Sequence, residues 1–578
     1  MNKALVIGED TRSFLSVIRS LGKMGVLVDV VCYDRTSPSL ASKYINRAWY
    51  FNYQSSLAND WLASVVELIN SQHYDLVFPC DERAIFPLFK AQERIDSKCR
   101  LALPNKEVRD SLFDKHLTKQ VAIQCGVRIA KGEMHNIEDH TYASLSSLYS
   151  PHFVIKPTES FNEDRLSSRN KVAIIASEKD FNDYLNQSDI EAQQFLIEEY
   201  FAGTGEGISL FACDGQVQYM FAHTRVNEPR SGGGSSYRKA IPLDPAMANA
   251  CVAICHATRY DGVGMFEFKK NYYTGEWILV EVNARFWGSL PLAIHAGIDF
   301  PRYYAQYLLG DYEHQLTPSS EYNLNAYARS FSNDMYDIRA EMQYLAVREG
   351  LTAGICTLIK RLTTYYRLLA NETIDSYDST DKQPFIAEFK QLANATLIDK
   401  LASKLPIKRN PERMNELMRV MYLLEGKGRL VFVCYGNIMR SPLAGVFSKM
   451  FIQNTSLVFD VASYGFHQNT NRRSPEACKH AARALGLDLS THRSQLLLQK
   501  ELTDNDIVFI FDQHNKAKLD KFYHAKNVFN LAEFIPKGLG KYRAIDDPYG
   551  HGEESVKQCY LLIVEALKAI FERYLSLK

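Results

Sequence analysis

The sequence predicts a multidomain α/β protein with an open parallel sheet near each end of the chain and helices between them. Three observations predict this class. Strand and helix signals alternate over the first hundred residues, a hairpin with acidic residues lies near residue 270, and an apolar run enters a loop and a helix near residue 434. The 578 residues suffice for three or four domains of ordinary size.

The composition excludes some classes of function. The 67 basic residues balance the 67 acidic ones, so no electrostatic field directs the chain toward nucleic acid. No apolar run approaches the ~18 residues of a membrane span, and the first residues lack the pattern of a cleaved signal. We therefore expect a cytoplasmic protein without an integral membrane segment. Eleven scattered cysteines with no CxxC pair are expected to stay reduced.

Residues 1–105 are expected to form the first parallel sheet. ALVIG and VLVDVVCY are typical of buried strands, TRSFLSVIRSLGKMG between them is typical of a helix, and YDLVFPCDE precedes another helical stretch. Gly8 ends the first strand, but no full GxGxxG pattern follows it. Dinucleotide binding is therefore unsupported.

The hairpin near residue 270 predicts a metal site. GVGMFEFKK and EWILVEVNARF both suit strands, and the turn at 273–275 ends in a glycine where a left-handed conformation is needed. Centring the turn on Thr274 places Glu267 directly opposite Glu281, with Asn283 further along the same face. Like charges repel at that spacing, and two carboxylates with an amide oxygen suit Mg²⁺. The alternative is a set of solvated charges on a hairpin edge.

Other residues before position 330 have the chemistry to bind a nucleotide. Lys115 precedes a helix and Lys156 ends a β-rich run, so both can neutralise polyphosphate. The stretch FLIEEYFAGTGEGISL supplies a hinge whose backbone groups can bind an adenine. Glu206 in the same stretch can bind the hydroxyl groups of a ribose. The glycine-containing loop VNEPRSGGGSSYRK is either a flexible surface loop or part of a carboxylate-binding site. The residues expected to hold that carboxylate are Arg225, Arg230, Ser235 and Arg238.

These residues, in this order, resemble the ATP-grasp superfamily, in particular its carbamoyl-phosphate-synthase-like and biotin-carboxylase-like members. The resemblance implies a pre-ATP-grasp α/β domain at 1–105, an α+β ATP-grasp domain at 106–330, and ATP with two Mg²⁺ ions as cofactors. The roles it implies are phosphate binding by Lys115 and Lys156, adenine binding by Glu198, Glu199 and Phe201, ribose binding by Glu206, Mg²⁺ binding by Glu267, Glu281 and Asn283, and contact with the reacting phosphoryl group by Arg285. The glycine-rich flap of the family is missing, because FNEDRLSSRNK follows Lys156.

Residues 331–427 are expected to be a helical spacer. DIRAEMQYLAVREGL and PERMNELMRVMYLLEG are typical of helices, with a polar stretch between them. The basic amphipathic piece TLIKRLTTYYRLL either packs against a neighbouring domain or contacts a membrane or a partner. Gly426 and Gly428 mark the entry to the last domain, at 428–578.

Residues 434–441 predict a loop that binds a phosphate group and carries a nucleophile. The apolar run LVFV before Cys434 is typical of a buried strand, and Ser441 with Pro442 suits a helix start. Backbone N–H groups, the helix N-terminus and the planar fork of Arg440 favour an anion there. The same surroundings favour the thiolate of Cys434 at neutral pH. The residues between them are Tyr435, Gly436, Asn437, Ile438 and Met439.

A general acid is expected in the turn formed by Asp546, Asp547, Pro548 and Tyr549. Attack of a thiolate on phosphorus requires protonation of the leaving oxygen, and a carboxylic acid is a suitable donor. The proline restrains Asp547, and Tyr549 can wall a slot for an aryl group.

Residues 429–578 resemble a low-molecular-weight protein tyrosine phosphatase with a doubly wound sheet. The resemblance implies a cysteinyl-phosphate intermediate and no cofactor. The roles it implies are nucleophile for Cys434, phosphate clamp for Arg440, thiolate stabilisation for Ser441, loop organisation for Asn437 and general acid for Asp547. Met439 stands where many members have a second cysteine, so a protective disulfide is not expected. An arsenate reductase is the alternative, but only Cys478 and Cys559 follow Cys434.

The sequence therefore predicts a bifunctional enzyme. One part is an ATP-dependent ligase that joins a small-molecule carboxylate to an amine through an acyl phosphate, and the other hydrolyses a phosphotyrosine protein or an aryl or alkyl phosphate. In a second hypothesis, the ATP-binding part regulates the phosphatase without turnover. In a third, the phosphatase acts on the substrate or product of the ligase.

Overall fold

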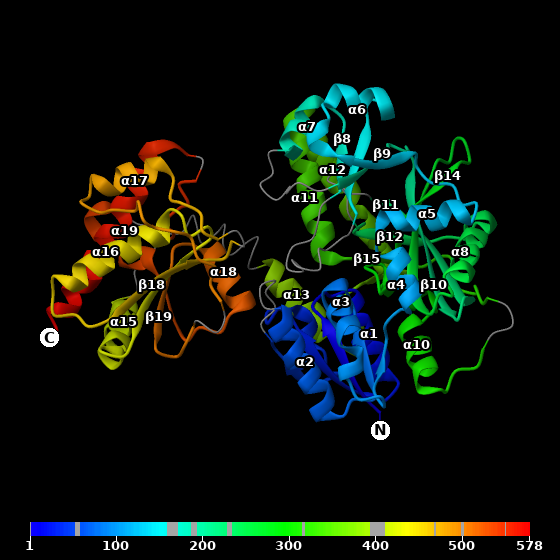
Figure 1. Ribbon diagram of the computed structural model, residues 1–578, viewed down its shortest axis with the longest axis horizontal. Coiled ribbons are helices and arrows are strands. Elements are labelled where there is room, and N and C mark those ends of the chain that lie inside the picture. The colour runs from blue at the N-terminus through cyan, green and yellow to red at the C-terminus, as the bar shows by residue number, and fades with distance from the viewer. Residues whose placement is uncertain are drawn as a thin grey trace. The chain divides into compact units, whose positions relative to one another are not determined.

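The computed structural model describes residues 2–51, 58–158, 172–185, 194–227, 234–314, 318–393, 411–467, 470–498, 502–540, 542–549 and 551–578. The chain forms two compact units (Figure 1). The first contains Met1–Tyr33 and Ser37–Leu392, and the second contains Asp34–Thr36 and Ala393–Lys578. Among the described helices, none combines the length and apolar character needed to cross a membrane. The cytoplasmic location stays a prediction.

The first unit begins with a parallel sheet of five strands in the order β3-β2-β1-β4-β5. The strands are β1 (Lys3–Gly8), β2 (Leu27–Cys32), β3 (Ile45–Trp49), β4 (Leu76–Pro79) and β5 (Arg100–Leu101), and the helices are α1 (Ser13–Lys23), α2 (Ala58–Gln72) and α3 (Glu82–Ala91). The near-continuous apolar runs of β1 and β2 suit strands buried on both faces. The strand order reverses between β1 and β4, and ligands of open α/β sheets bind beyond the carboxyl ends at such a switch point.

The second sheet of this unit has seven strands in the order β14-β13-β10-β11-β12-β15-β16. The strands are β10 (Thr204–Cys213), β11 (Gln216–Asn227), β12 (Tyr237–Ala240), β13 (Gly262–Lys270), β14 (Trp277–Asn283), β15 (Tyr327–Arg329) and β16 (Glu372–Ile374). One face packs against α4 (Lys106–Leu112), α5 (Lys115–Gln124) and α8 (Pro245–Ala257). The other face shares a core with α1, α9 (Leu290–Ala296) and α10 (Phe300–Leu309). The boundary expected at residue 105 thus falls inside one compact unit.

The hairpin of β13 and β14 has the predicted register next to the acidic pair. Met265 pairs with Asn283, and Glu267 pairs with Glu281. A β-bulge after Glu267 shifts the remaining pairs by one residue. Gly275 has φ +73°, the left-handed conformation expected of this turn. Both carboxylates therefore lie on the same face of the sheet.

A third, antiparallel sheet has the order β6-β9-β7-β8 and lies at the top of Figure 1 with its two helices. Its elements are β6 (Gly132–Asn136), β7 (Phe153–Pro157), β8 (Ala173–Ile175), β9 (Gln194–Glu199), α6 (Tyr142–Tyr149) and α7 (Glu178–Leu185). The stretch FNEDRLSSRNK, compared above with the glycine-rich flap, lies outside the described residues.

The predicted helical spacer is divided between the two units. Helices α11 (Phe331–Arg348), α12 (Leu351–Thr363) and α13 (Gln383–Ala393) belong to the first unit, where β16 pairs with β15. Helix α15 (Pro411–Leu424) packs into the core of the second unit. The sequence pattern identified the helices but not their partners, because an amphipathic stripe does not specify the surface that it covers.

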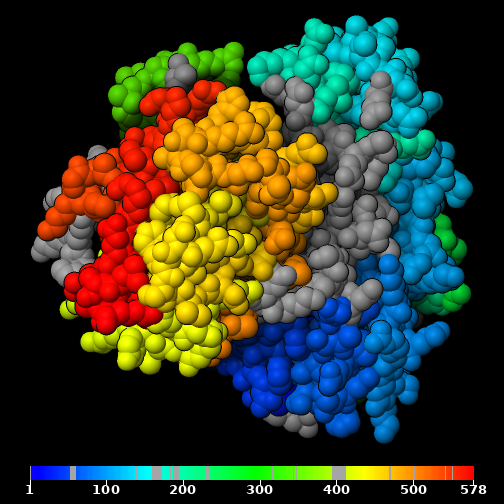
Figure 2. Space-filling view, turned by 60° about the vertical axis from the view of Figure 1, so that its left-hand side comes forward, coloured from blue at the N-terminus to red at the C-terminus, as the bar shows by residue number. Residues whose placement is uncertain are grey.

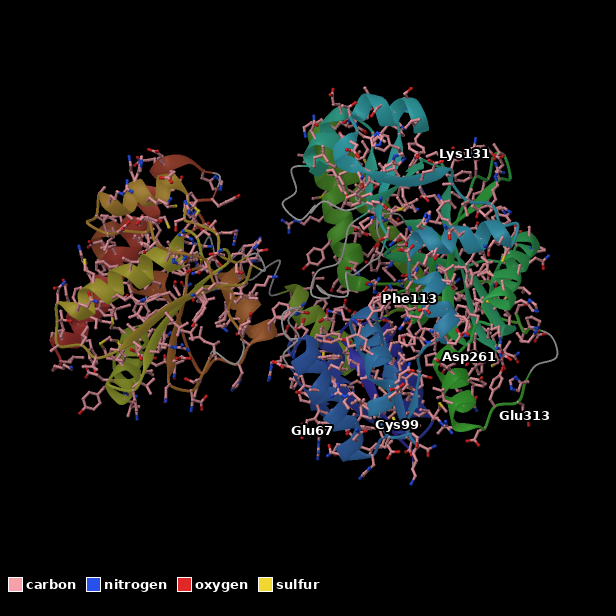
Figure 3. The ribbon with its side chains drawn as sticks, viewed as in Figure 1. Glu67, Cys99, Phe113, Lys131, Asp261 and Glu313 are labelled. Atoms are coloured by element: carbon pink, nitrogen blue, oxygen red, sulfur yellow. The ribbon has the colours of Figure 1, made fainter. Side chains whose placement is uncertain are left out.

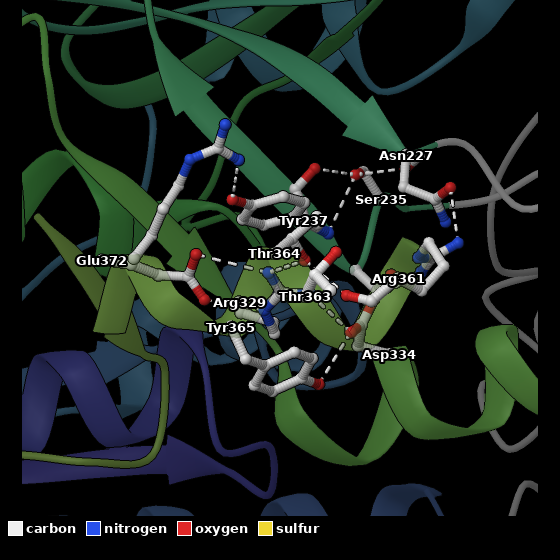
Figure 4. A network of polar contacts seen from close by, with 12 residues as sticks. Asn227, Ser235, Tyr237, Arg329, Asp334, Arg361, Thr363, Thr364, Tyr365 and Glu372 are labelled. Atoms are coloured by element: carbon white, nitrogen blue, oxygen red, sulfur yellow. Dashed lines mark hydrogen bonds and ion pairs between the residues drawn. The ribbon is translucent and has the colours of Figure 1, made fainter. Parts of the chain in front are cut away.

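A buried ionic cluster attaches α11 to the second sheet (Figure 4). The fully buried guanidinium of Arg329, on β15, lies 2.6 Å from Asp334 and 2.7 Å from Glu372. The rings of Tyr237 and Tyr365 lie over the same guanidinium, with centroids at 3.8 and 4.0 Å. A charge is tolerated at such depth only when it is fully paired, so these contacts depend on one another.

The second unit is a doubly wound parallel sheet in the order β18-β17-β19-β20. Its elements are β17 (Arg429–Cys434), α16 (Arg440–Gln453), β18 (Asp460–Gly465), α17 (Glu476–Arg483), β19 (Asp506–Ile510), α18 (Gln513–Phe522), β20 (Asn527–Asn530) and α19 (Gly552–Leu575). Helices α15, α16, α17 and α19 cover one face and α18 the other. Helices α16 and α19 lie side by side (Figure 2). The order reverses between β17 and β19, which places the loop after β17 at a switch point.

Candidate functional site

The loop between β17 and α16 brings three of the expected site residues together. Cys434 is the last residue of β17 and is only 2% exposed. Its Sγ lies 3.0 Å from the Ser441 hydroxyl and accepts a hydrogen bond from the backbone N–H of Asn437 at 3.3 Å. A hydroxyl and an amide that converge on sulfur stabilise its negatively charged form.

Asn437 organises this loop through both its backbone and its side chain. Its φ of +49° is left-handed, a conformation that asparagine tolerates better than most residues. Its Oδ1 accepts a bond from the N–H of Gln495 at 2.8 Å, and its Nδ2 donates to Ser441 at 2.9 Å and to Ser463 at 3.2 Å. Its carbonyl accepts a bond from Nε2 of His492 at 2.8 Å. The loop is therefore fixed from several elements.

The guanidinium of Arg440 is buried next to this loop. Nη1 donates to Asp512 at 2.5 Å and to the Ile545 carbonyl at 2.9 Å, and Nη2 donates to Asp547 at 2.6 Å. Burial by itself lowers the pKa of Arg440, but Cys434, Asp547 and Asp512 raise it above its ordinary value. Nε is buried without a partner in the described part of the chain. Three of its five N–H donors are therefore engaged by the chain, and the remaining two, on Nε and Nη2, have no hydrogen-bond partner among the described residues.

The side chains at the mouth of this site are more exposed. Asp547 is 40% exposed, and its Oδ1 accepts a hydrogen bond from the backbone N–H of Tyr549 at 3.3 Å. Tyr549 is 68% exposed and Tyr435 is 40% exposed. The Tyr435 ring contacts the rings of His467 and His514. An aromatic mouth with a carboxyl group beside a buried thiol and guanidinium suits an aryl phosphate.

In the first unit, Glu198 binds two lysines. Its Oε1 lies 2.6 Å from Nζ of Lys119 and its Oε2 lies 2.5 Å from Nζ of Lys156. Burial raises the pKa of Glu198, but the two lysines lower it by more than burial raises it, so the pKa lies below its ordinary value. Both carboxylate oxygens are thus engaged by lysines. Its contact with an adenine stays a prediction.

The other residues expected at the nucleotide have the following contacts. Glu199 accepts a bond from the N–H of Lys131, which Figure 3 labels, at 3.0 Å. The carbonyl of Phe201 accepts a bond from Nζ of Lys269 at 3.4 Å. Glu206 accepts a hydrogen bond from the Tyr272 hydroxyl, and burial raises the pKa of Glu206.

A pocket connects Lys115 with the acidic hairpin. Its wall is formed by Glu82, Leu112, Phe113, Lys115, Thr118, Glu281, Val282, Asn283 and Ala284. Phe113 marks its position in Figure 3. Lys115 is the first residue of α5, and Glu281 and Asn283 are on β14. The fold thus brings a lysine from one element to two expected metal ligands on another.

The donor set at the hairpin fits a hard divalent cation. Glu267 and Glu281 face each other, and Nδ2 of Asn283 donates to Glu281 at 3.0 Å. Arg225 forms an ion pair with Glu267. No cluster of three or more His, Cys, Asp or Glu side chains placed to hold a metal occurs among the described residues, so this set consists of two carboxylates and an amide. Oxygen ligands of this kind suit Mg²⁺, which retains water ligands.

Comparison with known proteins identifies both regions. Residues 429–576 match the family model of the low molecular weight phosphotyrosine protein phosphatases, and residues 191–329 match a model described as ATP-grasp in the biosynthetic pathway with Ter operon. The chain joins an ATP-grasp region to a low-molecular-weight phosphatase domain.

Individual relatives agree with this assignment of the phosphatase domain. The low molecular weight phosphotyrosine protein phosphatase of Schizosaccharomyces pombe is 24% identical over 145 residues, which are 24% of this chain and 90% of the relative. The protein-arginine-phosphatase of Bacillus subtilis is 28% identical over 146 residues, which are 24% of this chain and 93% of the relative.

A solved structure is similar to a different part of the chain. It is the biotin carboxylase domain of Hydrogenobacter thermophilus 2-oxoglutarate carboxylase, which is 15% identical with a TM-score of 0.45. The match covers 56% of this chain and 73% of the biotin carboxylase chain.

The sequence analysis missed two residues of the phosphatase domain that contact the loop. Asp512, the N-cap of α18, pairs with Arg440, and Arg472 donates to the Gly436 carbonyl at 2.6 Å. The sequence could have indicated Asp512, because it follows the buried strand β19, and the carboxyl ends of β19 and β17 lie at the same edge of the sheet. Arg472 lies in a segment between β18 and α17 and had no signal in the sequence.

The sequence analysis of the ATP-grasp region missed Lys119, and two residues that it offered for a carboxylate site have partners within the chain. Lys119 follows Lys115 by one turn of α5, so both lie on one face of that helix. Arg238 is bound by Asp375 at 2.5 and 2.7 Å and donates to the Gly288 carbonyl at 3.0 Å. Ser235 donates to backbone carbonyls. Both side chains thus have partners within the chain, and Arg230 lies outside the described residues.

Proposed function

We propose that the phosphatase domain hydrolyses phosphotyrosine or a related aryl phosphate through a cysteinyl-phosphate intermediate. The observation that carries this proposal is the position of Sγ of Cys434, 3.0 Å from the Ser441 hydroxyl in a loop next to the buried guanidinium of Arg440. The exposed rings of Tyr435 and Tyr549 support an aryl leaving group over a small alkyl one.

In the proposed reaction, the Cys434 thiolate attacks phosphorus while the bond to the leaving oxygen breaks. Asp547 in its protonated form gives its proton to that oxygen. Water then attacks the phosphoenzyme, the Asp547 carboxylate takes a proton from the water, and sulfur leaves as a thiolate. Ser441 and the N–H of Asn437 stabilise that thiolate, and Arg440 orients the phosphoryl oxygens.

The substitution Asp547→Asn tests the general acid. We expect the rate with phenyl phosphate to fall by about 10² to 10⁴, the range for lost acid catalysis. The rate with p-nitrophenyl phosphate will fall much less, because its leaving group needs little protonation. The control is Asp546→Asn, an exposed neighbour. Equal losses with both substrates would remove the acid role from Asp547.

We propose that residues 106–330, together with the sheet of residues 1–105, use ATP and Mg²⁺ to activate a carboxylate for transfer to an amine. The pocket that joins Lys115 to Glu281 and Asn283 supports this function. When bound, ATP supplies the phosphoryl group and Mg²⁺ neutralises its charge. Glu267, Glu281 and Asn283 would hold the metal.

The chain's own residues provide positioning and charge. Lys115 and Lys156 would neutralise phosphate oxygens, and Arg285, whose Nε lies 2.7 Å from Glu82, would stabilise the charge of the reacting phosphoryl group. A substrate carboxylate attacks the terminal phosphorus as ADP leaves, and the amine then displaces phosphate from the acyl carbon and loses a proton. The ion pairs of Glu198 with Lys119 and Lys156 hold these two lysines in place before the nucleotide binds.

The substitution Glu281→Ala tests the ligase proposal. We expect ADP release stimulated by an amino acid or amine to fall by about 10² or more, because the charge on the phosphates is no longer neutralised. The matched control is Glu276→Ala, an exposed glutamate on the turn of the same hairpin. ADP release that no carboxylate–amine pair stimulates in the unsubstituted protein would instead favour an ATP-binding module that regulates the phosphatase.

A further inference from the structure

The loop after β1 carries an arginine at the switch point of the first sheet. β1 ends at Gly8 and α1 begins at Ser13, and Ile7 on β1 pairs with Pro79 on β4. Arg12 therefore lies beyond the carboxyl ends of the two strands between which the order reverses. This crevice is where open α/β sheets bind their ligands.

The guanidinium of Arg12 lies between two glycines of the ATP-grasp region. A Cβ at Gly288 would lie 2.7 Å from Nη1 and 2.9 Å from Cζ of Arg12, and a Cβ at Gly234 would lie 3.7 Å from Nη1. A side chain at position 288 would thus displace the guanidinium from this position. The two glycines leave a slot that the half-buried Arg12 occupies.

The other arginines of this wall have carboxylate partners. Arg225 pairs with Glu267, Arg238 with Asp375 and Arg285 with Glu82. Arg238 also approaches the carbonyl of Gly288, so two guanidinium groups contact one residue. Among the described residues, the guanidinium of Arg12 has no carboxylate or carbonyl partner. Of the four described arginines named here, Arg12 is therefore the one whose positive charge has no carboxylate beside it. This favours an anion from outside the chain.

A second side chain with a free polar atom lies on the same wall. Gly207 pairs with Glu267 on one side and with His223 on the other, so the imidazole and the carboxylate share a face of the sheet. His223 is 5% exposed, and its Nδ1 has no partner in the described part of the chain. Burial, together with Arg238 and Arg225, lowers the pKa of His223 to about 3. The ring is therefore neutral and can accept or donate one hydrogen bond.

We infer that Arg12 binds the carboxylate group of a small-molecule substrate, and that Nδ1 of His223 binds a polar group of the same molecule. This subsite deepens the proposed ligase function and rests on it, because it places the substrate between the first sheet and the pair Glu267–Glu281. The carboxylate site is thereby assigned to the β1–α1 loop rather than to Arg238 and Ser235, which the chain itself engages.

Arginine footprinting on the full chain tests this assignment. Phenylglyoxal modification, read by peptide mass spectrometry, is compared with and without acetate, succinate, L-glutamate or inorganic phosphate. We expect at least one carboxylate to slow modification of Arg12 by about threefold or more once its concentration exceeds about twice its Kd, since protection follows 1 + [L]/Kd. Arg94, an exposed surface residue, is the internal control and should react at an unchanged rate. Protection by none of the three carboxylates, or by phosphate alone, overturns the inference.

Two variants separate binding from folding. Arg12→Gln should abolish the saturation-transfer NMR signal of the protecting carboxylate, and Arg12→Lys should retain part of it, while the Tm of both stays unchanged. An undiminished signal in Arg12→Gln overturns the inference. Binding of MgADP, measured separately by calorimetry, distinguishes the two proposals. MgADP binding without carboxylate protection rejects only the subsite, and carboxylate protection without MgADP binding rejects only the ligase function.

Discussion

Replacing Cys434 by serine will abolish hydrolysis of p-nitrophenyl phosphate by the phosphatase domain. We expect kcat to fall on the order of 10⁶-fold, the size of loss seen when a covalent nucleophile is removed. The physical reason is that a serine hydroxyl does not ionise near neutral pH, and among the described residues only Ser441 and the N–H of Asn437 form hydrogen bonds with the side chain at position 434, neither of which is a base. The measurement is the steady-state release of p-nitrophenol.

The same variant should still bind phosphate, because Arg440 and the loop backbone remain. Binding can be followed by the shift of the domain's Tm with inorganic phosphate. The control is Cys356→Ser, an exposed thiol on α12 that should leave the rate unchanged. Undiminished turnover in Cys434→Ser would mean that the nucleophile lies elsewhere.

Replacing Arg329 by methionine will destabilise the first unit by about 3 to 5 kcal/mol, the usual cost of leaving buried charges without their partner. Glu372 would lose the guanidinium that pairs with it, and Asp334 would lose Arg329 but keep its ion pair with Arg361; both carboxylate side chains are fully buried. Calorimetry of the full chain measures the effect, with the phosphatase transition identified by its shift with inorganic phosphate. That transition should not move.

Two further variants sharpen this test. Arg348→Met removes an exposed arginine of α11 and should change stability by less than about 0.5 kcal/mol. The triple variant Arg329→Met, Asp334→Leu, Glu372→Leu removes all three charges and should recover much of the loss. An unchanged first-unit Tm in Arg329→Met would show that the cluster contributes little to stability.

Features that depend on a short stretch of chain were predictable. The pairing of Glu267 with Glu281 follows from strand alternation and a turn with glycine, and the structure has that register. The bulge after Glu267 was not predictable, since the alternation alone carries no signal for an extra residue. The loop from Cys434 to Arg440 was predictable because a strand, a loop and a helix start follow one another directly.

Features that depend on distant partners were not predictable. The sequence supplied Arg238 as a substrate-binding candidate, but the fold pairs it with Asp375, 137 residues away. It likewise supplied Glu198 without its partner Lys119, which the fold brings to it from 79 residues away. An arginine or a lysine suits any carboxylate equally well until the chain brings one particular carboxylate to it.

The sequence by itself determined the two families, the phosphate loop and the acidic hairpin, because each is encoded within a few dozen consecutive residues by turn chemistry and side-chain alternation. The tertiary structure decided which cations remain available to ligands, because burial makes an unpaired charge costly and the fold therefore pairs nearly every one it encloses. Arg12, which lies between two glycines that are distant from it in the sequence, could be recognised as a cation available to a ligand only from the structure.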